Sequence, residues 1–419
     1  MYSIGEEEIE QIRKVIQSRK FFRYEAGRLG TCERFERDFA KKLGSRKALT
    51  VTTGTNALIA ALGALGVGPG DEVLLPAYTF VATAYAVAAV RAVPVLVNID
   101  EQLGMCPVDM RTKITRRTRA AIVVHMDGQA ANMDAIMSVA KAANLKVIED
   151  TAQAIGGKYK RRSLGTIGDI GCFSFNQDKI LTCGEGGAIV TKSEELFERC
   201  AYMQDGASLF TTRLWNKAKA TPFMGGAMRV SEIQGAMLIV QLDRLDGILE
   251  KLRERAKIWT EEFEKSELPL KVIRGHDPKG ACGTSVVLSF DSIENSTKAS
   301  RVLQFLGVSS VQILSRPGHS FWEWMELLHQ GRMAHHPRLN PLHLATVQQP
   351  FQFEKYLPTL EILQKALKIN VNYDMSAAQT QRLARKVRRD LEKALKVVSS
   401  IQISRRSPAH QRESVLGTV

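Results

Sequence analysis

Residues 47–150 alternate short apolar runs with helical segments, and this alternation restricts the fold more than any other feature of the sequence. The apolar runs have the length and composition of buried strands. The expected strands are Ala48–Val51, Glu72–Pro76, Val93–Val97, Ala120–Val124 and Leu145–Glu149, and the clearest helix between them is Ala57–Leu65. Strands and helices that alternate in this way predict an α/β domain around a mostly parallel sheet.

Helical patterns dominate the rest of the chain. Two amphipathic helices are expected before the first strand, one with Ile9, Ile12, Val15 and Ile16 on its apolar face, the other with Phe35, Phe39 and Leu43. From Ser231 a helical pattern of more than thirty residues predicts a long helix, or a kinked pair, that joins two domains. A strand at Ser285–Phe290 and a last helix from near Ser376 follow. We therefore predict a large domain over residues 1–250, a smaller C-terminal α/β domain over 251–400 and a flexible basic tail over 401–419.

Composition excludes several classes of protein. With 44% hydrophobic and 24% charged residues, the chain of 419 residues has the composition of a globular protein rather than a disordered one. Half of its net charge of +14 lies in residues 380–419, on the polar face of an amphipathic helix without interleaved aromatic residues, so a solvated face is expected rather than a nucleic-acid site. There is no signal-peptide pattern, no apolar run of membrane-spanning length and no cysteine pair with metal-site spacing. We expect a cytoplasmic protein with reduced thiols, without nucleic acid, membrane or metal.

Two segments offer groups suited to binding a ligand at the sheet edge. Thr53-Gly54-Thr55 precedes a helix, where unpaired backbone N–H groups and the helix dipole favour an anion such as phosphate; simple helix capping is the alternative. An apolar strand ends in Glu149-Asp150, and Gln153 follows. At such a strand end Asp150 could bind a metal, act as a base, pair with a cationic heterocycle or cap the next helix.

Two further segments add a nucleophile and an aromatic ring. Ser174 offers a hydroxyl to a phosphate, and Lys179 precedes the glycine-rich run 184–187. Lysine forms Schiff bases with carbonyl compounds when its surroundings lower its pKa, although a surface lysine is the alternative. Phe80 follows a strand, where its ring could stack on a planar ligand or pack in the core.

These segments, in this order, resemble the DegT/StrS family of pyridoxal-phosphate (PLP) sugar aminotransferases. The resemblance covers nearly the whole chain and rests on GTNALIAALGALGVGPGDEVLLPAYTFVATA, VPVLVNID, VIEDTAQAIGGKYKRRSLGTIGDIGCFSF, LTCGEGGAIVT and RVSEIQGAMLIVQLDRLD. It implies the PLP-dependent transferase fold of type I, the aspartate-aminotransferase fold, with a large domain and a smaller C-terminal domain. It also implies a homodimer with shared active sites.

The resemblance assigns a role to each residue of the four segments. Lys179 would hold PLP as a Schiff base and carry the proton between cofactor and substrate carbons. Asp150 would pair with the protonated pyridine nitrogen and keep the ring an electron sink. The remaining contacts implied are Phe80 on the ring face, Gln153 near the phenolic oxygen, and Ser174 with Thr53, Gly54 and Thr55 around the phosphate.

The same resemblance implies a reaction. The family's dehydratase branch has His at the position of Lys179, so the lysine favours transfer of an amino group from L-glutamate or L-glutamine to a keto or aldehyde sugar or cyclitol. Several stretches look like the branch of the scyllo-inosose aminotransferases and equally like enzymes acting on an eight-carbon 3-deoxy-octulosonate, substrates without a nucleotide. The alternatives are a nucleotide-diphosphate (NDP) keto-hexose aminotransferase and, from another class, a catalytically silent PLP-binding regulator.

One position departs from the family pattern. Where the family has an Asn that reaches the PLP phosphate of the neighbouring subunit, this chain has Ala227, so we expect weaker phosphate binding or replacement by another group such as Arg229. Arg23, in a loop between two helices, and Arg213 and Lys217, in the loop 206–222, are candidate contacts for an anionic substrate.

The last candidate site residues are histidines. His125, at a strand end, is expected to be a structural residue with satisfied hydrogen bonds. The stretch Ser315–His343 is rich in His and Trp and could close over the site from the small domain. Its His335-His336 pair has no carboxylate at ligand spacing, which argues against a metal site.

Overall fold

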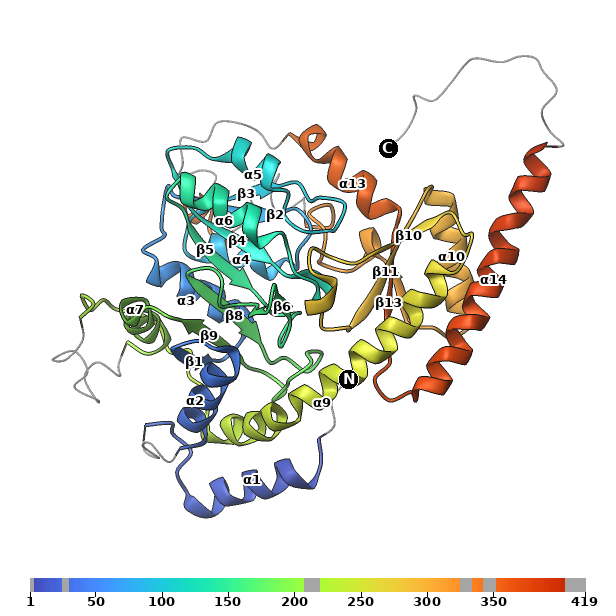
Figure 1. Ribbon diagram of the computed structural model, residues 1–419. Coiled ribbons are helices and arrows are strands. Elements are labelled where there is room, and N and C mark those ends of the chain that lie inside the picture. The colour runs from blue at the N-terminus through green and yellow to red at the C-terminus, as the bar shows by residue number, and fades with distance from the viewer. Residues whose placement is uncertain (1–3, 25–29, 207–218, 325–333, 342–351, 404–419) are drawn as a thin grey trace.

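The computed structural model describes residues 4–24, 30–206, 219–324, 334–341 and 352–403 (Figure 1). Its centre is a sheet of seven strands in the order β1-β9-β8-β5-β4-β2-β3. The strands are β1 (Lys47–Val51), β2 (Glu72–Pro76), β3 (Val93–Val97), β4 (Thr118–Val124), β5 (Lys146–Asp150), β8 (Ile170–Ser174) and β9 (Gly187–Thr191). β9 runs antiparallel to β1 and β8, and the other neighbours pair in parallel. The predicted α/β domain around a mostly parallel sheet is confirmed.

Two apolar layers cover the two faces of this sheet. Successive strand residues alternate between them: Leu74 belongs to one cluster, Val73 and Leu75 to the other. Helices α2 (Thr31–Leu43), α5 (Pro107–Lys113), α6 (Met133–Ala142) and α9 (Glu232–Glu264) contribute to the first layer; α3 (Gly54–Ala64), α4 (Ala82–Ala89) and α7 (Glu194–Gln204) contribute to the second. A small hairpin, β6 (Lys158–Tyr159) with β7 (Arg162–Ser163), precedes β8.

The N-terminal helix is confirmed, but only part of its predicted apolar face is buried. α1 (Glu6–Ser18) packs on α9, but it buries Glu8 and Val15, while Ile9 and Ile16 are 44% and 53% exposed. The reason is polar: Glu8 accepts hydrogen bonds from the Gly5 backbone N–H at the helix start, and its carboxylate also bonds Gln241 and Arg244 of α9. These contacts rotate the isoleucines outward.

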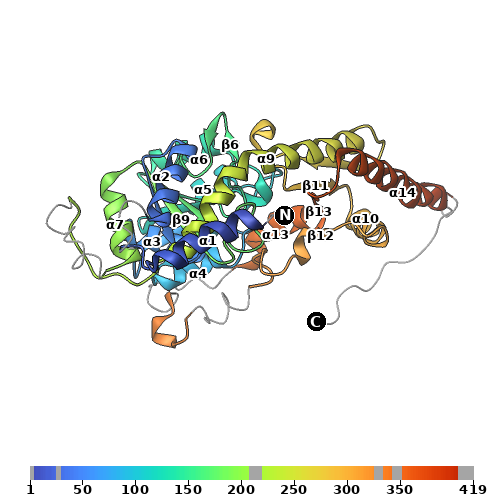
Figure 2. The same cartoon turned by 90° about the horizontal axis from the view of Figure 1, so that it is seen from below.

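One uninterrupted helix of 33 residues joins the two halves of the molecule. α9 begins at a capping box of Ser231 and Gln234, and it runs from the large sheet to the C-terminal region (Figures 1 and 2). The long helix is thus confirmed in its unkinked form. The predicted boundary between residues 250 and 251 falls inside it, and the division into domains stays a prediction.

The C-terminal region has its own sheet, with every neighbour antiparallel. Its order is β10-β11-β13-β12, from β10 (Leu270–Ile273), β11 (Ser285–Phe290), β12 (Ser310–Gln312) and β13 (Ala366–Asn370). The helices are α10 (Ile293–Phe305), α13 (Leu357–Gln364) and α14 (Ala377–Ile403). Short 3₁₀ turns occupy Pro278–Gly280, Ile313–Ser315, Pro337–Leu339 and Phe353–Tyr356 in this region, and Met126–Gly128 after β4 of the large sheet.

The last helix carries much of the chain's excess positive charge. α14 buries Val387, Leu391 and Leu395, whereas Arg385 and Arg389 are among its exposed basic residues, so the predicted solvated face is confirmed. The helix extends to Ile403, further than the predicted start of the tail at 401; residues 404–419 lie outside the described residues. All six cysteines are free thiols. None of the described helices combines the length and apolar character needed to cross a bilayer.

Candidate functional site

A cavity of about 410 Å³ opens where the strands of the large sheet end and the C-terminal region begins. The start of α3 and segments that follow β2, β5 and β8 line it, and the C-terminal region adds further side chains. All eight residues that the sequence assigned to a cofactor line this cavity: Thr53, Gly54, Thr55, Phe80, Asp150, Gln153, Ser174 and Lys179. Carboxyl ends of parallel strands are the usual ligand edge of such a sheet.

The start of α3 forms a cradle for an anion. Thr53 is the N-cap, and its hydroxyl accepts the Asn56 backbone N–H at 3.0 Å, while Gly54 and Thr55 occupy the first helical positions, whose N–H groups have no partner within a helix. A Cβ at Gly54 would lie 2.8 Å from the Cβ of Ser174, so glycine is required for the approach of the two segments. Ser174 places its hydroxyl beside this helix start. The chemistry of these donors fits a phosphate.

Asp150 presents a buried carboxylate at the end of β5. The Thr83 hydroxyl and the Ala152 backbone N–H donate to its two oxygens at 3.0 and 3.2 Å. Burial raises the pKa of Asp150, and these two donors together with the positive charge of Lys179 oppose the rise. A carboxylate in such surroundings is stabilised by a cationic partner, which fits a protonated ring nitrogen.

Glu149, the neighbouring carboxylate, points away from the cavity and organises the strand end. It accepts hydrogen bonds from His125 Nε2 at 2.9 Å and from the backbone N–H groups of Gly165, Ile167 and Gly168. The Nδ1 of His125 accepts the Ala131 N–H. Both side chains are fully buried, so the prediction of a satisfied structural His125 is confirmed.

Lys179 lies between β8 and β9 and lines the same cavity as Asp150. Burial lowers the pKa of its ammonium group; the Asp150 carboxylate opposes this effect and Arg316 adds to it. A lysine whose pKa is lowered has more of the neutral amine, the form that attacks a carbonyl carbon. The structure therefore gives Lys179 the surroundings of a nucleophile rather than of a surface lysine.

Phe80 keeps one side of its ring open in the cavity. The side chain is 46% exposed, and His319 of the C-terminal region lies against it, with ring centroids 5.0 Å apart. Burial is the largest cause that lowers the pKa of His319 to about 4, so its imidazole is neutral near pH 7. The position of Phe80 fits stacking on a planar ring.

The stretch Ser315–His343, which was expected to close over the site, does contribute Arg316 and His319 to the cavity, although neither residue was singled out from the sequence; Lys368 was not predicted at all. The segment 316–321 reaches the site because it pairs with the segment after β2: Val81 N–H donates to Gly318 O, and Phe321 N–H to Ala77 O. Sequence spacing carries no sign of this long-range pairing. Lys368 did carry a signal, since it is a charged residue within the buried strand β13.

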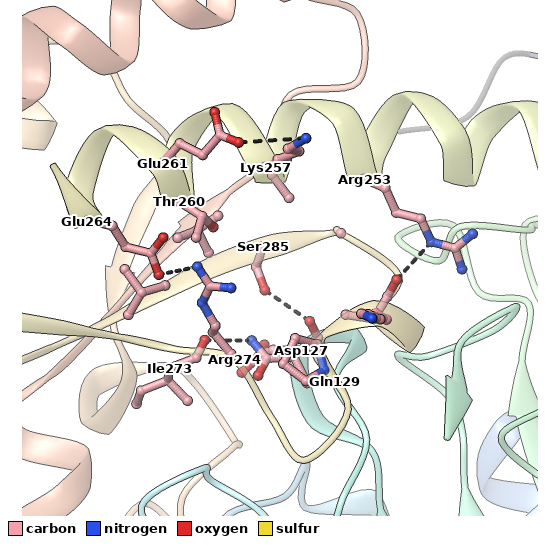
Figure 3. A pocket seen from close by; sticks show the side chains of 17 residues that line it. Asp127, Gln129, Arg253, Lys257, Thr260, Glu261, Glu264, Ile273, Arg274 and Ser285 are labelled. Carbon is pink, nitrogen blue, oxygen red and sulfur yellow. Dashed lines mark hydrogen bonds and ion pairs between the residues drawn. The ribbon is translucent and has the colours of Figure 1, made fainter. Parts of the chain in front are cut away.

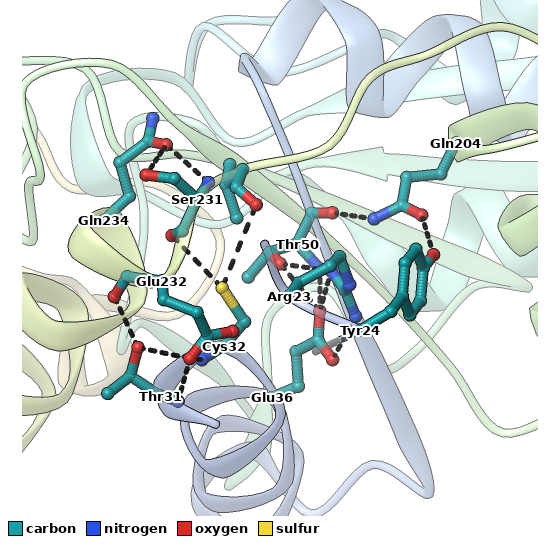
Figure 4. A network of polar contacts seen from close by, with 11 residues as sticks. Arg23, Tyr24, Thr31, Cys32, Glu36, Thr50, Gln204, Ser231, Glu232 and Gln234 are labelled. Atoms are coloured by element: carbon teal, nitrogen blue, oxygen red, sulfur yellow. Dashed lines mark hydrogen bonds and ion pairs between the residues drawn. The ribbon is translucent and has the colours of Figure 1, made fainter. Parts of the chain in front are cut away.

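Arg23 does not reach the cavity. Its guanidinium donates two hydrogen bonds to Glu36, at 2.9 and 3.0 Å, and one to the Thr50 hydroxyl, and its side chain is only 9% exposed (Figure 4). Burial alone lowers the pKa of Arg23, but the Glu36 charge outweighs it and raises the pKa above its usual range. Within this chain Arg23 joins the loop before α2 to Glu36 and β1, and its role in substrate binding stays a prediction.

The other predicted substrate contacts lie elsewhere. Arg229 pairs with Asp205 at 2.5 Å and is not among the residues that line the cavity. Ala227 is exposed and forms a backbone bridge with Asp205. Arg213 and Lys217 lie outside the described residues, as do His329 and His343. Within the described ranges no three His, Cys, Asp or Glu side chains gather where they could hold a metal ion.

Comparison with known proteins gives related sequences and structures. A model of the DegT/DnrJ/EryC1/StrS aminotransferase family matches residues 2–319. The GDP-perosamine synthase of Escherichia coli O157:H7 is 37% identical over 228 residues, 54% of this chain and 61% of that protein. A putative L-glutamine:3-amino-2,3-dideoxy-scyllo-inosose aminotransferase of Micromonospora echinospora is 37% identical over 273 residues, 62% of this chain and 61% of that protein. The match thus spans about three fifths of these curated relatives.

A solved structure matches more completely. The aminotransferase from Psychrobacter cryohalolentis superposes with a TM-score of 0.78 at 26% identity, and the match covers 94% of this chain and 98% of that one. Both the large sheet and the C-terminal region therefore lie within the shared fold.

Proposed function

This chain belongs to the DegT/DnrJ/EryC1/StrS aminotransferase family, and on that premise we propose that it is a PLP-dependent aminotransferase. It moves an amino group from L-glutamate or L-glutamine to a keto or aldehyde sugar or cyclitol. The main support for this proposal is that Lys179, Asp150 and the anion cradle of α3 line one cavity. Each of these groups would interact with a different part of PLP, which is an aromatic aldehyde that carries a phosphate.

The residues present fit PLP at each of its recognisable parts. The N–H groups of Gly54 and Thr55 and the hydroxyl of Ser174 would hold the phosphate, Phe80 would stack on the ring, and Asp150 would pair with the ring nitrogen. Gln153 would lie near the phenolic oxygen. When bound, PLP supplies the electron sink that stabilises negative charge at the amino-bearing carbon.

Lys179 has the central part in the proton transfers. Its Nζ, whose pKa burial lowers, would take a proton from the donor's α-carbon and return it on the cofactor side. With the cofactor bound, Asp150 would pair with the ring nitrogen and hold its position in both halves of the reaction. In the second half Lys179 moves the proton in the opposite direction, toward the carbon of the acceptor that becomes amino-bearing.

For the acceptor we propose a non-nucleotide substrate of the scyllo-inosose or octulosonate type. One relative is named for an amino-dideoxy-scyllo-inosose, and another for GDP-perosamine, so an NDP-keto-hexose is the alternative acceptor.

A silent PLP-binding regulator is the second candidate, and Ala227 favours it because an Asn contact to the cofactor is missing. A single half-reaction separates the two functions. On addition of L-glutamate or L-glutamine to the holoenzyme, an aminotransferase loses the visible absorbance of its bound cofactor and releases a 2-oxo acid. A regulator keeps both the absorbance and the amino acid unchanged.

We also propose a homodimer in which each subunit completes the other's site. The described surface exposes the large apolar side chains of Ile9, Ile16, Phe21 and Phe22 around the N-terminal helix, as a subunit interface requires. Ala227 is exposed in the single chain, where the side chain at this position remains accessible to a neighbouring subunit.

The substitution Ala227→Asn is expected to tighten PLP binding roughly two- to tenfold, the value of one added hydrogen bond. An amide at this position can donate to the phosphate across the dimer interface, whereas the methyl group of Ala cannot. Titration of apoenzyme with PLP, followed by absorbance, measures the change. Ala142→Asn, at an exposed position of α6, is the control. An unchanged affinity in the Ala227 variant would mean that the position does not face the phosphate.

A further inference from the structure

His319 lines the cavity proposed to hold PLP, but none of the roles assigned above uses it. The segment that carries it is held against the chain that follows β2. On one side of His319 the Val81 backbone N–H donates to the Gly318 carbonyl at 2.7 Å, and on the other the Phe321 N–H donates to the Ala77 carbonyl at 2.9 Å. The backbone of His319 is therefore fixed between two hydrogen bonds.

The imidazole ring is also held by packing. Its centroid lies 5.0 Å from that of the Phe80 ring. Gly318 has a φ of 68°, and a Cβ built there would lie 3.1 Å from a carbon of the Phe80 ring. Glycine is thus required at position 318 both for the left-handed backbone and for the close approach of the two segments. A ring fixed in this way can present one nitrogen in a constant direction.

One hydrogen bond decides which nitrogen of His319 carries the proton. Nδ1 lies 2.7 Å from the backbone oxygen of Pro317, and because a carbonyl oxygen can only accept, Nδ1 carries the proton and donates it. Since the ring is neutral near pH 7, Nε2 keeps a free lone pair. No residue in the described ranges donates a hydrogen bond to Nε2. Nε2 is therefore an uncharged acceptor that can serve a ligand.

Two neighbouring cations are engaged elsewhere and leave Nε2 available. Arg316 and Lys368 line the same cavity, and their positive charges help to lower the pKa of His319, whereas the negative charge of Asp127 opposes them. Arg316 Nη1 and Lys368 Nζ each lie 2.8 Å from Oδ1 of Asp127. Their donors therefore point to a carboxylate and not to the imidazole.

A second cavity of about 410 Å³ offers a comparison (Figure 3). None of the residues that line it is a histidine. Arg274 pairs there with Glu264, and Arg253 donates to the Ala281 carbonyl. The side-chain oxygen of Gln129 has no partner among the described residues, but this atom is fully buried and out of reach of a ligand. The accessible, uncharged nitrogen acceptor is thus a feature of the PLP cavity.

The proposed ligands differ in the hydrogen bonds that they can donate. The phosphate and phenolic oxygen of PLP accept, as do the carboxylates of L-glutamate, whose amino group is the one that reacts. A sugar or cyclitol, in contrast, carries several O–H donors. We propose that Nε2 of His319 accepts a hydrogen bond from a hydroxyl of the carbonyl substrate and so selects polyhydroxylated ketones or aldehydes; this rests on the aminotransferase function proposed above. A site built to bind a hydroxyl discriminates against the analogue that lacks it.

Binding of scyllo-inositol, a polyol that cannot be aminated, to the PLP-loaded enzyme tests this role by calorimetry without turnover. His319→Phe keeps an aromatic ring against Phe80 but has no acceptor, and it is expected to bind roughly 5- to 100-fold more weakly, the effect of leaving one hydroxyl unpaired. His319→Gln, whose amide oxygen can reach the place of Nε2, should retain binding, whereas the shorter His319→Asn should not. His335→Phe, at an exposed position outside the cavity, is the matched control.

Kinetics separate substrate recognition from a structural effect. In His319→Phe the KM for the carbonyl substrate is expected to rise by a similar factor, while kcat and the KM for L-glutamate or L-glutamine change little. The analogue that lacks the recognised hydroxyl should react equally with the wild type and this variant. Equal affinity of both proteins for scyllo-inositol, no binding by the wild type, or an equal rise in KM for the amino donor overturns the proposal. Absence of any amino transfer by the wild type refutes the aminotransferase function, whereas calorimetry still decides the role of His319.

Discussion

Replacement of Lys179 by Ala is expected to lower transamination by at least ~10³-fold, within the range of losing a positioned acid–base group. Lys179 lines the same cavity as Asp150, and its pKa is lowered by burial, so no other described lysine combines this position with this reactivity except Lys368, which is held by Asp127. Single-turnover measurements with L-glutamate give the rate. The visible absorbance of the covalently held cofactor is expected to disappear as well.

Lys158→Ala removes an exposed lysine of β6 and serves as the control for this variant. The Lys179 variant should still bind PLP without a covalent link, because the α3 cradle, Phe80 and Asp150 are intact. If the variant keeps both the absorbance band and its turnover, the assignment of Lys179 is wrong.

The substitution Asp150→Asn is expected to lower the rate of the first half-reaction by roughly 100-fold or more, the size typical of removing one preorganised electrostatic partner. Asn has the same shape and can still accept from Thr83, but it carries no charge to hold a ring nitrogen in its protonated form. Rapid-mixing absorbance with L-glutamate at saturation measures this step.

The control for Asp150 is Asp291→Asn, an exposed carboxylate before α10. PLP affinity of the Asp150 variant should fall less than its rate, since the phosphate contacts lie at α3 and Ser174. A rate equal to that of the wild type would show that the Asp150 charge has no part in the reaction.

The strands β1 to β5 could be predicted because the pattern that marks each of them lies within a few consecutive residues. Each strand from β1 to β5 is a short apolar run between turns, and the groups of the site follow directly where the runs end, as Asp150 does after Val147 and Ile148. Parallel strands bring such ends to one edge, but the grouping of Phe80, Asp150 and Ser174 in one site came from the resemblance to the aminotransferase family. Neither β8 nor β9 was predicted as a strand, and a strand of five residues such as β9 carries no sign of its antiparallel direction.

Residues whose roles depend on distant partners were missed or misassigned. Arg23 looked like a free loop arginine because nothing in its neighbourhood indicates that Glu36, on α2, faces it across a buried pair. Apolar spacing grouped Ile9 with Val15 on one face of α1, but only Val15 is buried, because the contacts of Glu8 with α9 set the orientation of the helix. Arg316 joins the site only through the pairing of its segment with residues 77–81.

The most direct test of the proposed function is the transfer of labelled nitrogen. The holoenzyme is incubated with L-glutamate or L-glutamine carrying heavy nitrogen at the amino group and, in separate reactions, with keto-cyclitols, keto-sugar acids and NDP-keto-hexoses. Mass spectrometry of the products is expected to find the label as a new amine on a non-nucleotide acceptor, with release of the corresponding 2-oxo acid. A label that stays on the amino acid with every acceptor, while the enzyme holds PLP, would contradict the proposal that this chain is a sugar aminotransferase.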